Sequence, residues 1–454
     1  MRETMLDRLE TTLRVRGGAR LEGSVETHGA KNAALPIMAA SLLARTPVTL
    51  HGVPRITDVS VMWSLLESLG ARLRYEGTGT VTIDAGNVSE TRAPYALVRK
   101  LNASFDLTGA LLGRFGCAEV PLPGGCVLGT RATDLHEMAF TALGCTVENR
   151  HGYFVARSRT GTLQGAEIAF PRSSVGATKN AMLAAVMARG TTVLRNVALE
   201  PEVTDLANFL VAMGAKISGI GGEVLVIEGV SSLHGVEYRI IPDRIVAGTL
   251  LLCGAATRGD VTVRSCVPGH LDALLEKLRE CGVAVSTGDD WVRADARGVT
   301  GGTDILTAPY PGFPTDLQPP MTAFLCTAPG TSVIEEKIFN ARFSYVNELA
   351  RMGADVRVSM ESNSAVVKGG SPLSGAPVEA PDIRAGAALV VAGLAATGET
   401  EIIGLEYIDR GYERLEEKLS ELGGQVQRSS GVTQCVEPAG LFETSAYPAV
   451  RPAS

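Results

Sequence analysis

Six copies of one short pattern run along the chain, and this repeat restricts the possible folds more than any other feature. In each copy a Leu, Met or Cys and a glycine stand between apolar residues, as in LESLGARL, LVAMGAKI and LARMGADV. The repeated glycines lie 68 to 74 residues apart, at Gly70, Gly144, Gly214, Gly282, Gly353 and Gly423. A period near 70 residues is longer than that of the common solenoids. The chain therefore consists of six related units.

Each unit shows the same expected order of elements. A helix rich in Ala and Leu, such as NAALPIMAASLLA, precedes a β-branched strand such as TPVTLHGV. A second, amphipathic helix ends at the repeated glycine, which suits the left-handed C′ position of a helix. Another strand follows, so the pattern predicts about βαβαββ for each unit. The first helices are apolar on nearly all faces and should be buried, whereas the second helices should lie outside.

The six units divide into two groups of three, which predicts two domains of an α/β fold. With 454 residues, 45% hydrophobic and 20% charged, the chain is typical of a globular protein with two or three domains. The net charge of −7 and the aromatic content of 5% argue against a nucleic-acid-binding protein. Any site for an anion must therefore be local.

The eight cysteines and the termini define the expected environment. The cysteines form no C-x-x-C pair and no zinc-finger spacing with histidine, so we expect no metal site. The chain start lacks the apolar stretch of a signal peptide, and no run of about 18 uncharged apolar residues predicts a transmembrane helix. We expect a cytoplasmic protein with reduced thiols and no membrane contact. The chain also lacks a P-loop, a G-x-S-x-G elbow and an H-E-x-x-H motif.

The first chemical motif is HGAKNAALP, in which Lys31 and Asn32 open the first buried helix. A helix N-terminus presents unpaired N–H groups and a positive dipole, and the lysine adds a full charge. The motif therefore predicts an anion site. The structural alternative is a solvated lysine at a helix start.

The second motif is the glycine-rich segment PLPGGCVLGTRATDLH, which carries Cys126, Arg131 and His136. An exposed cysteine near an arginine has a lowered thiol pKa and can act as a nucleophile or a proton donor. The other seven cysteines mostly have apolar neighbours, as core residues do. Cys126 is therefore the candidate reactive thiol, with a small residue in a turn as the alternative. His136 fits a helix cap or a buried histidine equally well.

Acidic and basic residues of the second half form a third group. Asp316 lies between prolines in YPGFPTDLQPP, where it fits either a general base or the N-cap of the following helix. Four arginines, Arg244, Arg342, Arg384 and Arg410, each stand at an expected helix start in a separate repeat. The guanidinium group suits carboxylates and phosphates, so these arginines point to one shared anionic site. Surface ion pairs with nearby acidic residues are the alternative.

Together the motifs GAKNAALP, PGGCVLGTRATDLH, FPTD, DIRA and IDRGYERLEEKL resemble those of the enolpyruvyl transferases, the EPSP synthase superfamily. The resemblance runs from about residue 13 to about residue 428 and is strongest to the branch that uses UDP-N-acetylglucosamine in peptidoglycan synthesis. It implies two inside-out α/β barrels, each of three βαβαββ units. The implied domains are 31–241 and 12–30 with 242–428, and the implied tails are 1–11 and 429–454.

The resemblance also implies the reaction. Enolpyruvate would pass from phosphoenolpyruvate to a sugar hydroxyl of a uridine nucleotide, with release of phosphate and without a cofactor. Lys31, Arg131 and Arg410 would hold the phosphate, and Arg384 and Arg342 the carboxylate region. Cys126 would protonate the methylene carbon or attach to phosphoenolpyruvate, and Asp316 would take the proton of the attacking hydroxyl. The implied acceptor contacts are Asn32, Asn102, Arg131, Ala132, Thr133, Asp134, Leu135, Arg172, Ser173, Ser174, Val175, Gly176 and Ile338.

Several residues depart from the pattern of the family, and they are expected to cluster on the nucleotide side. Asn102 replaces an arginine, Asn340 and Ala341 replace the acid and amide of FENRF, His28 replaces a small residue and Arg172 replaces a lysine. The acceptor therefore stays open between UDP-N-acetylglucosamine, expected first, and another nucleotide such as UMP in nucleoside-antibiotic synthesis. Shikimate-3-phosphate is disfavoured because its enzymes lack this cysteine loop. A repeat-built binding protein with a degenerate site is disfavoured because the motif residues are intact. The oligomeric state stays open.

Overall fold

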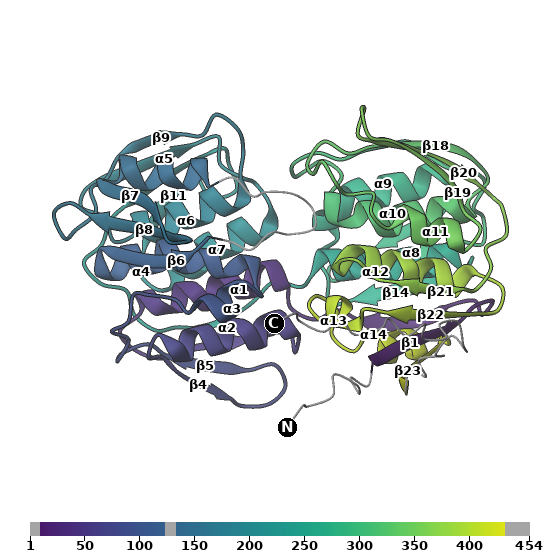
Figure 1. The fold of residues 1–454 in the computed structure, drawn as a ribbon, viewed down its shortest axis with the longest axis horizontal. Helices are drawn as coiled ribbons and strands as arrows, with labels where there is room; N and C mark the ends of the chain where they lie inside the picture. Colours follow the sequence, from purple (N-terminus) through teal and green to yellow (C-terminus); the bar gives the residue numbers. More distant parts are fainter. Residues whose placement is uncertain (1–9, 123–132, 432–454) are drawn as a thin grey trace, which may run out of the picture.

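The computed structural model describes residues 10–122 and 133–431 of the chain, which form two bodies side by side (Figure 1). Each body has its own hydrophobic core. One core is built from residues 30–240, and the other from residues 13–25 and 245–426. We call these bodies the first half and the second half. The architecture is a mixed α/β fold.

Three small sheets belong to the first half. Their strands are β3 (Val48–His51), β4 (Arg72–Tyr75), β5 (Val81–Asp84), β6 (Cys117–Pro121), β7 (Cys145–Arg150), β8 (Tyr153–Ser158), β9 (Glu167–Ala169), β10 (Thr191–Arg195), β11 (Lys216–Ser218), β12 (Val224–Glu228) and β13 (Glu237–Arg239). The strand orders are β13-β3-β5-β4, β6-β8-β7 and β9-β10-β12-β11. In both four-stranded sheets the first pair is parallel and the other pairs are antiparallel.

Three more sheets belong to the second half. Their strands are β1 (Glu10–Arg16), β2 (Glu22–Glu26), β14 (Asp260–Arg264), β15 (Ala284–Thr287), β16 (Trp291–Asp295), β17 (Ile305–Leu306), β18 (Gly330–Glu335), β19 (Asp355–Ser359), β20 (Ser364–Gly369), β21 (Pro377–Glu379), β22 (Glu399–Ile403) and β23 (Gln425–Gly431). The strand orders are β2-β14-β16-β15, β17-β18-β20-β19 and β21-β22-β1-β23. Buried and exposed positions alternate along strands such as β14 and β20, as expected for sheets with one face in water.

Helices lie in both halves, and they differ in how much of their surface is buried. Those of the first half are α1 (Lys31–Ala40), η1 (Ser41–Leu43), α2 (Thr57–Ser68), α3 (Tyr95–Val98), η2 (Asn102–Asp106), α4 (Leu107–Phe115), α5 (Asp134–Ala142), α6 (Val175–Ala185) and α7 (Pro201–Ala212). Those of the second half are α8 (Arg244–Ala256), η3 (Pro268–Leu271), α9 (Asp272–Glu280), η4 (Thr315–Leu317), α10 (Gln318–Thr327), α11 (Val346–Arg351), α12 (Ile383–Ala395), α13 (Leu405–Ile408) and α14 (Leu415–Glu421). The helices α8, α10 and α12 contact one another, and nearly all their residues are buried because they are apolar on every face. By contrast, α9 and α14 bury only one face.

The repeated glycines take the backbone conformation that the sequence predicts. All six have φ between +88° and +103°, and each stands just after a helix of its unit. This left-handed conformation ends the helix and turns the chain toward the next strand. The prediction of a glycine C-cap in every repeat is therefore confirmed.

Four of the six sheets differ from the regular unit, and two of these exchange their first strands, because β13 pairs with β3 and β2 with β14. The sheet β6-β8-β7 has three strands, and its first-strand position is reduced to one parallel bridge between Arg92 and Glu119. In the last sheet, β1 from the start of the chain pairs with β22 and β23. The beginning and the end of the described chain are thus joined in one sheet.

The chain crosses between the halves twice, and the two crossings run side by side. Gly29 forms an antiparallel bridge with Pro242, and the N–H of Asp243 donates to the carbonyl oxygen of His28 at 2.9 Å. These contacts hold the starts of α1 and α8 together. The molecule thereby gathers helix N-termini of both halves in one region.

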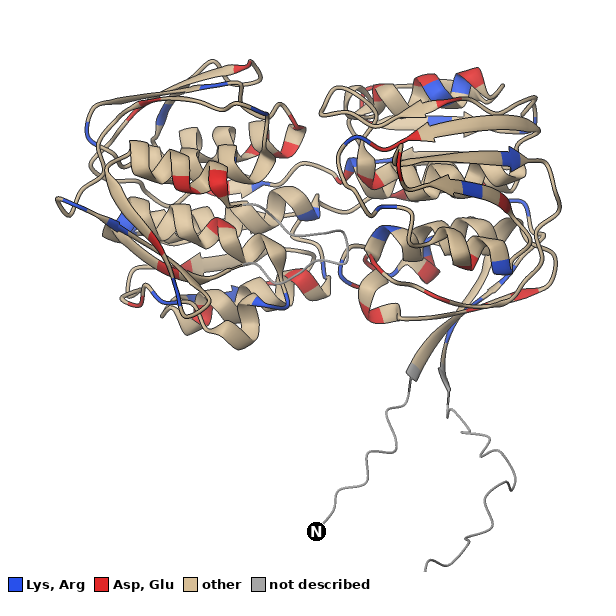
Figure 2. Cartoon of the chain, turned by 45° about the horizontal axis from the view of Figure 1, so that its top comes forward, with Lys and Arg blue, Asp and Glu red and all other residues tan. Residues whose placement is uncertain are grey.

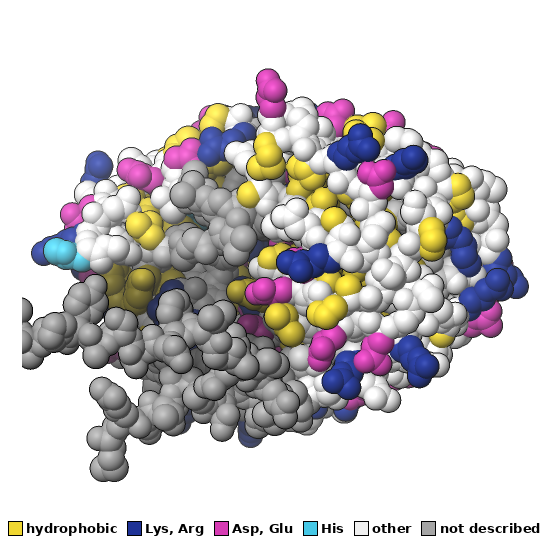
Figure 3. Space-filling model, turned by 45° about the vertical axis from the view of Figure 1, so that its right-hand side comes forward, with side chains coloured by type: hydrophobic (Ala, Val, Ile, Leu, Met, Phe, Trp, Pro, Cys, Tyr) yellow, Lys and Arg dark blue, Asp and Glu magenta, His cyan; other side chains and the backbone are white. Residues whose placement is uncertain are grey.

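Charged side chains of both signs are spread over the two halves (Figure 2). On the described part of the face in Figure 3, basic and acidic side chains alternate and no continuous basic field forms. Among the described helices, none combines the length and apolar character needed to cross a membrane.

Candidate functional site

Lys31 begins α1 beside the two chain crossings. A Cβ atom on Gly29 would lie 1.8 Å from the carbonyl oxygen of Gly52, so this position of the motif requires glycine. The backbone N–H of Lys31 donates to Oδ2 of Asp243 at 3.0 Å, and the residue is 8% exposed. Lys31 is therefore a buried cation, and the alternative of a solvated lysine is wrong.

Asp58, near the start of α2, binds two cations that come from different halves. The Nζ atom of Lys31 lies 2.9 Å from Oδ2, and Nε of Arg410 donates to Oδ1 at 2.7 Å. The N–H of Thr57 also donates to the carbonyl oxygen of Asp409 at 2.9 Å. Asp58 is buried, whereas 24% of the Arg410 side chain is exposed. The structure thus brings Lys31 and Arg410 together on one carboxylate.

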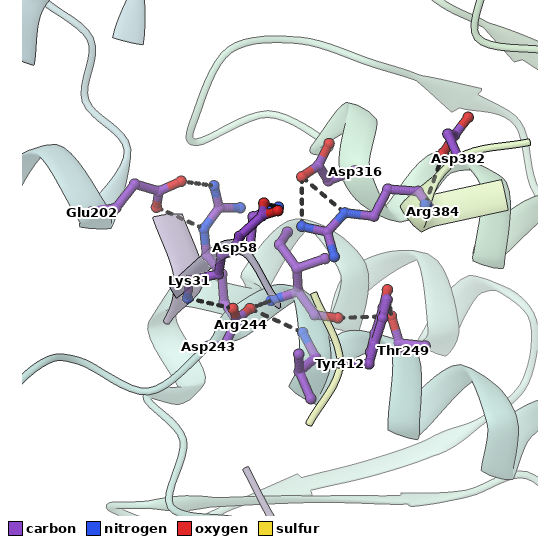
Figure 4. Close-up of polar contacts among 12 residues, drawn as sticks. Lys31, Asp58, Glu202, Asp243, Arg244, Thr249, Asp316, Asp382, Arg384 and Tyr412 are labelled. Atoms are coloured by element: carbon purple, nitrogen blue, oxygen red, sulfur yellow. Dashed lines mark hydrogen bonds and ion pairs between the residues drawn. The ribbon is translucent and has the colours of Figure 1, made fainter. Parts of the chain in front are cut away.

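Asp316 lies in η4 and faces two buried arginines of the second half. Arg384 donates from Nε and Nη2 to Oδ2 at 3.1 and 2.9 Å, as Figure 4 shows. Arg342 donates from Nη2 to Oδ1 at 3.1 Å. The N-cap of α10 is Leu317, without a side-chain hydrogen bond, so the alternative that Asp316 caps this helix is wrong. Asp316 instead stands in an ion-pair cluster, in which Arg342 comes from its own repeat and Arg384 from the next one.

The charges around Asp316 determine its protonation. Burial alone would raise its pKa, but Arg384, Arg342 and Lys31 outweigh burial and hold the pKa below its ordinary value. For Lys31, burial is the main cause of a lowered pKa, Asp58 acts against it and Arg384 adds to it. Burial would likewise lower the pKa of Arg384, yet Asp316 raises it. The site therefore combines an ionised carboxylate with a cluster of cations.

Two buried arginine donors in this cluster have no acceptor in the part of the chain that the structure describes. Nε of Arg342 and Nη1 of Arg384 find no hydrogen-bond partner among the described residues. The guanidinium group of Arg384 also lies 5.5 Å from the ring of Tyr412, whose hydroxyl bonds with Thr249 at 3.1 Å. A buried unpaired donor is costly, so these atoms favour an additional anionic acceptor.

Arg244 is separate from the other arginines. It begins α8, and its Nε and Nη2 donate to Glu202 of the first half at 3.3 and 3.2 Å (Figure 4). The expectation that all four arginines start helices is wrong for Arg342, which lies in the turn before α11, and for Arg410, which follows α13. The next helix begins four residues after Arg342, at Val346, and five residues after Arg410, at Leu415. Both arginines therefore lie in turns rather than in helices.

His28 lies at the first of the two crossings between the halves. Its Nε2 accepts from the backbone N–H of Glu413 at 3.3 Å, and Oε2 of Glu413 accepts from the N–H of Arg55 at 3.0 Å. His28 therefore lies beside the turn that carries Arg410. The crossing segment that holds His28 packs against this turn, and its expected place on the nucleotide side stays a prediction.

Most of the described residues expected on the nucleotide side lie in or just before three neighbouring segments of the first half, η2, α5 and α6. Asn102 begins η2, Asp134 begins α5 and Ser174 caps α6, where its Oγ accepts from the N–H of Ala177 at 3.3 Å. Arg172 donates from Nη2 to both carboxylate oxygens of Asp134 at 2.8 and 2.7 Å. This ion pair is about half exposed and joins the start of α5 to the segment just before α6.

The other residues expected to contact the nucleotide range from buried to exposed. The side chain of Leu135 packs in the first core, so only its backbone can face a ligand, whereas Ile338 is 37% exposed. The half-buried members are Asn32, Asn102, Thr133, Ser173, Val175 and Gly176. Cys126, Arg131 and Ala132 lie outside the described residues.

Sequence reasoning missed several residues of this region. Asp243 and Asp382 could have been predicted as N-caps, because each precedes an apolar helix, in PDRIVAG and PDIRAGA. In the structure each accepts two backbone N–H groups at a helix start. No sequence signal could have identified Asp58, since its partner Arg410 is 352 residues away along the chain. Within residues 10–122 and 133–431, no group of three His, Cys, Asp or Glu residues could hold a metal ion.

Comparison with known families and sequences gives consistent matches over most of the chain. The family model for EPSP synthase (3-phosphoshikimate 1-carboxyvinyltransferase) matches residues 15–419. The UDP-N-acetylglucosamine 1-carboxyvinyltransferase of Psychrobacter sp. (strain PRwf-1) is 48% identical over 428 residues, which cover 94% of this chain and 98% of that protein. UDP-N-acetylglucosamine 1-carboxyvinyltransferase 1 of Carboxydothermus hydrogenoformans is 47% identical over 415 residues, or 91% and 97% of the two chains.

Solved structures agree at the level of the fold. The enolpyruvyl transferase NikO from Streptomyces tendae matches with a TM-score of 0.80 and 28% identity, over 93% of this chain and 99% of that chain. An EPSP synthase from Acinetobacter baumannii matches with a TM-score of 0.71 and 18% identity, over 92% and 100% of the two chains. The second match supports the fold alone.

Proposed function

This chain belongs to the EPSP synthase family, and we propose from that membership that it transfers the enolpyruvyl group of phosphoenolpyruvate to a hydroxyl of UDP-N-acetylglucosamine. Relatives that are 47–48% identical over more than nine-tenths of the chain are UDP-N-acetylglucosamine 1-carboxyvinyltransferases. The enzyme is thus an enolpyruvyl transferase of peptidoglycan synthesis. The observation that carries the proposal is the cation cluster around Asp316 and Asp58, which offers several fixed positive charges to one anionic substrate.

The two halves correspond to domains 31–241 and 12–30 with 242–428, each an inside-out α/β barrel with helices inside and sheets outside. The two separate hydrophobic cores support this division. The contacts of α8, α10 and α12 with one another support the barrel description.

Lys31, Arg131 and Arg410 bind the phosphate of phosphoenolpyruvate. The support is that Lys31 and Arg410 already meet on one carboxylate, that of Asp58. A phosphate carries more charge than a carboxylate and offers more acceptor oxygens, so it can take over these contacts. Arrival of phosphoenolpyruvate therefore competes with Asp58 for the two cations.

Arg384 and Arg342 bind the carboxylate of phosphoenolpyruvate. Their buried donors without an acceptor support this role. A substrate carboxylate between the two arginines would weaken their bonds to Asp316 and so raise the pKa of Asp316 from its depressed value. Substrate binding would in this way convert an arginine-bound carboxylate into a stronger general base.

The reaction proceeds by addition and elimination. Asp316 takes the proton of the acceptor hydroxyl, whose oxygen forms a bond with C2 of phosphoenolpyruvate, while Cys126 gives a proton to the methylene carbon C3. The product of addition is a tetrahedral ketal. Loss of a proton from C3 and of phosphate from C2 then yields the enol ether. The cations stabilise the leaving phosphate best when closure has excluded water.

The uridine nucleotide contacts Arg131, Ala132, Thr133, Asp134 and Leu135. Further contacts come from Arg172 and from the N-terminus of α6, while Ile338 packs near the uracil and Asn32 meets the sugar. Support comes from the contact between α5 and α6 and from the Arg172–Asp134 ion pair, which joins the start of α5 to the segment before α6. The expected contacts at the start of α6 are Ser173, Ser174, Val175 and Gly176.

A second candidate acceptor is a smaller uridine nucleotide such as UMP. The observation that favours it is Asn102, where the family pattern has an arginine, together with Asn340 and Ala341. Phosphate release from phosphoenolpyruvate with UDP-N-acetylglucosamine or UMP tests both candidates. We expect rapid release with UDP-N-acetylglucosamine. Phosphate release with UMP but not with UDP-N-acetylglucosamine would identify UMP as the acceptor. Release with neither nucleotide would overturn the proposed function.

A further inference from the structure

Glu336 is a buried carboxylate that follows β18 and makes no contact with a cation among the described residues. It is 1% exposed. Its Oε1 atom accepts from the hydroxyl of Thr307 at 2.9 Å and from the N–H groups of Ile338 and Phe339 at 2.7 and 3.0 Å. Its Oε2 atom accepts from the hydroxyl of Thr315 at 2.9 Å. Hydrogen bonds thus occupy both oxygens of this buried carboxyl group, which restricts it to one orientation.

The turn that contains Glu336 is held from a second side. The side-chain amide of Asn363 donates to the carbonyl oxygens of Glu336 and Phe339 at 2.6 and 3.0 Å. The N–H of Lys337 donates to the hydroxyl of Thr307 at 2.8 Å. These three contacts hold the residues that follow Glu336 in one geometry.

The two oxygens of Glu336 connect different parts of the proposed site. Oε1 holds the turn that presents Ile338, which is exposed. Oε2 holds Thr315, the residue directly before Asp316. Arg342 also connects the two parts. Its guanidinium group lies 5.6 Å from the ring of Phe339 in the turn and donates to Asp316.

We propose that Glu336 is a positioning residue that couples the nucleotide contact at Ile338 to the orientation of Asp316. This inference rests on the proposed function, in which Ile338 meets the uracil and Asp316 is the general base. Through Oε1, Glu336 sets the position of the Ile338 turn and thus the affinity for the acceptor. Through Oε2, it sets the direction of the Asp316 carboxylate and thus the rate of the chemical step.

The variants Thr307→Val and Thr315→Val separate these two effects. Thr307→Val removes one donor to Oε1 and the acceptor for the Lys337 N–H, so the KM for UDP-N-acetylglucosamine should rise about tenfold with little change in kcat. Thr315→Val removes the donor to Oε2, so kcat should fall about tenfold with little change in that KM. The KM for phosphoenolpyruvate should stay within about twofold of the wild type in both variants.

Substitutions of Glu336 itself complete the test. Glu336→Ala should show both defects. Glu336→Gln should restore most activity, because its carbonyl oxygen can replace Oε1 and its amide can donate to the hydroxyl of Thr315. Glu335→Gln is the matched control, since Glu335 is its exposed neighbour and its carboxylate pairs with Lys337 at 2.8 Å. Thermal unfolding of each protein shows whether it is folded at the assay temperature.

The outcomes are distinct. A KM change for Thr307→Val and a kcat change for Thr315→Val, with rescue by Glu336→Gln, would support the coupling. Wild-type kinetic constants in both threonine variants would overturn it, as would equal changes in the KM of both substrates, which indicate a merely structural role. A wild-type enzyme that releases no phosphate with UDP-N-acetylglucosamine would overturn the proposed function first, and this inference with it.

Discussion

Arg410 donates to Oδ1 of Asp58 at 2.7 Å, while Lys31 lies 2.9 Å from the other oxygen of the same carboxylate. Arg410 belongs to the second half and Asp58 to the first, so this ion pair connects the two halves at the proposed phosphate site. Without substrate, a protein carboxylate balances the two cations that the substrate phosphate is proposed to bind. In the proposed function, Asp58 keeps these cations in place and competes with the substrate phosphate for them.

Replacing Asp58 by asparagine should destabilise the free protein and strengthen its response to phosphate. Removal of the buried anion leaves Lys31 and Arg410 repelling each other, which should cost about 3 kcal/mol of unfolding free energy. Inorganic phosphate should restore part of this loss, because it binds the folded state. Thermal unfolding with and without phosphate measures both effects. Glu67→Gln, at an exposed position on the same helix, is the control; an equal phosphate response in all three proteins would contradict the prediction.

Replacing Asp316 by asparagine should remove the general base. We expect kcat to fall by about 10²–10⁴ while the protein stays folded. The carboxamide has no negative charge, so Arg342 and Arg384 lose their anionic partner and phosphoenolpyruvate should bind at least as well as before. Steady-state kinetics and direct binding of phosphoenolpyruvate check the two parts. A variant with more than a tenth of the wild-type kcat would exclude Asp316 as the base.

Fosfomycin, an epoxide, should alkylate Cys126 and no other cysteine. Burial raises the pKa of the Cys253 and Cys326 thiols to about 12 and that of Cys145 to about 11, so these thiols stay protonated and unreactive. Intact mass and peptide mapping after incubation identify the adduct. Cys126→Asp should keep some turnover, because a carboxylic acid can donate a proton, and should form no adduct. Adducts spread over several cysteines would rule out a uniquely reactive thiol.

Replacing Asn102 by arginine should report on the acceptor. A restored charge-assisted contact to a phosphate is worth about 1.5–3 kcal/mol, or roughly ten- to hundredfold in affinity. With UDP-N-acetylglucosamine as acceptor, kcat/KM of the variant should equal or exceed that of the wild type. If UMP were the natural acceptor, the wild type would use it faster than the sugar nucleotide, and the arginine would shift the preference toward the diphosphate. Parallel kcat/KM measurements with both nucleotides decide between these outcomes.

Stability should fall on acidification because of His136. Burial, assisted by the charge of Lys179, lowers its pKa to about 4, whereas an unfolded histidine titrates near pH 6.5. Between these pH values the unfolded chain binds the proton and the folded chain does not, so the unfolding free energy decreases as the pH falls, by up to about 3 kcal/mol. Denaturant unfolding at pH 7 and pH 4.5 measures this change. His136→Gln should show a smaller loss, and an identical loss in both proteins would show that other groups cause it.

The sequence alone was sufficient to predict the repeated architecture. A glycine after each second helix and an apolar surface on each first helix are local properties, and the backbone responds to them locally. Gly282, for example, has the left-handed φ of +88° that its position requires, and α8 is buried except for Arg244. The motif residues could also be selected from their chemical type and the resemblance to a known family.

Only the tertiary structure decided which of these groups meet. Asp58 reaches Arg410 across 352 residues, and Asp316 reaches Arg384 across 68, because the packing of whole repeats determines these distances. The same packing turned Arg244 toward Glu202 and placed His28 beside the Arg410 turn. Burial then altered the chemistry, since desolvation and three nearby cations together set the pKa of Asp316. A sequence pattern carries the type of each side chain, whereas its partners and its hydration arise only when the repeats pack against one another in the folded chain.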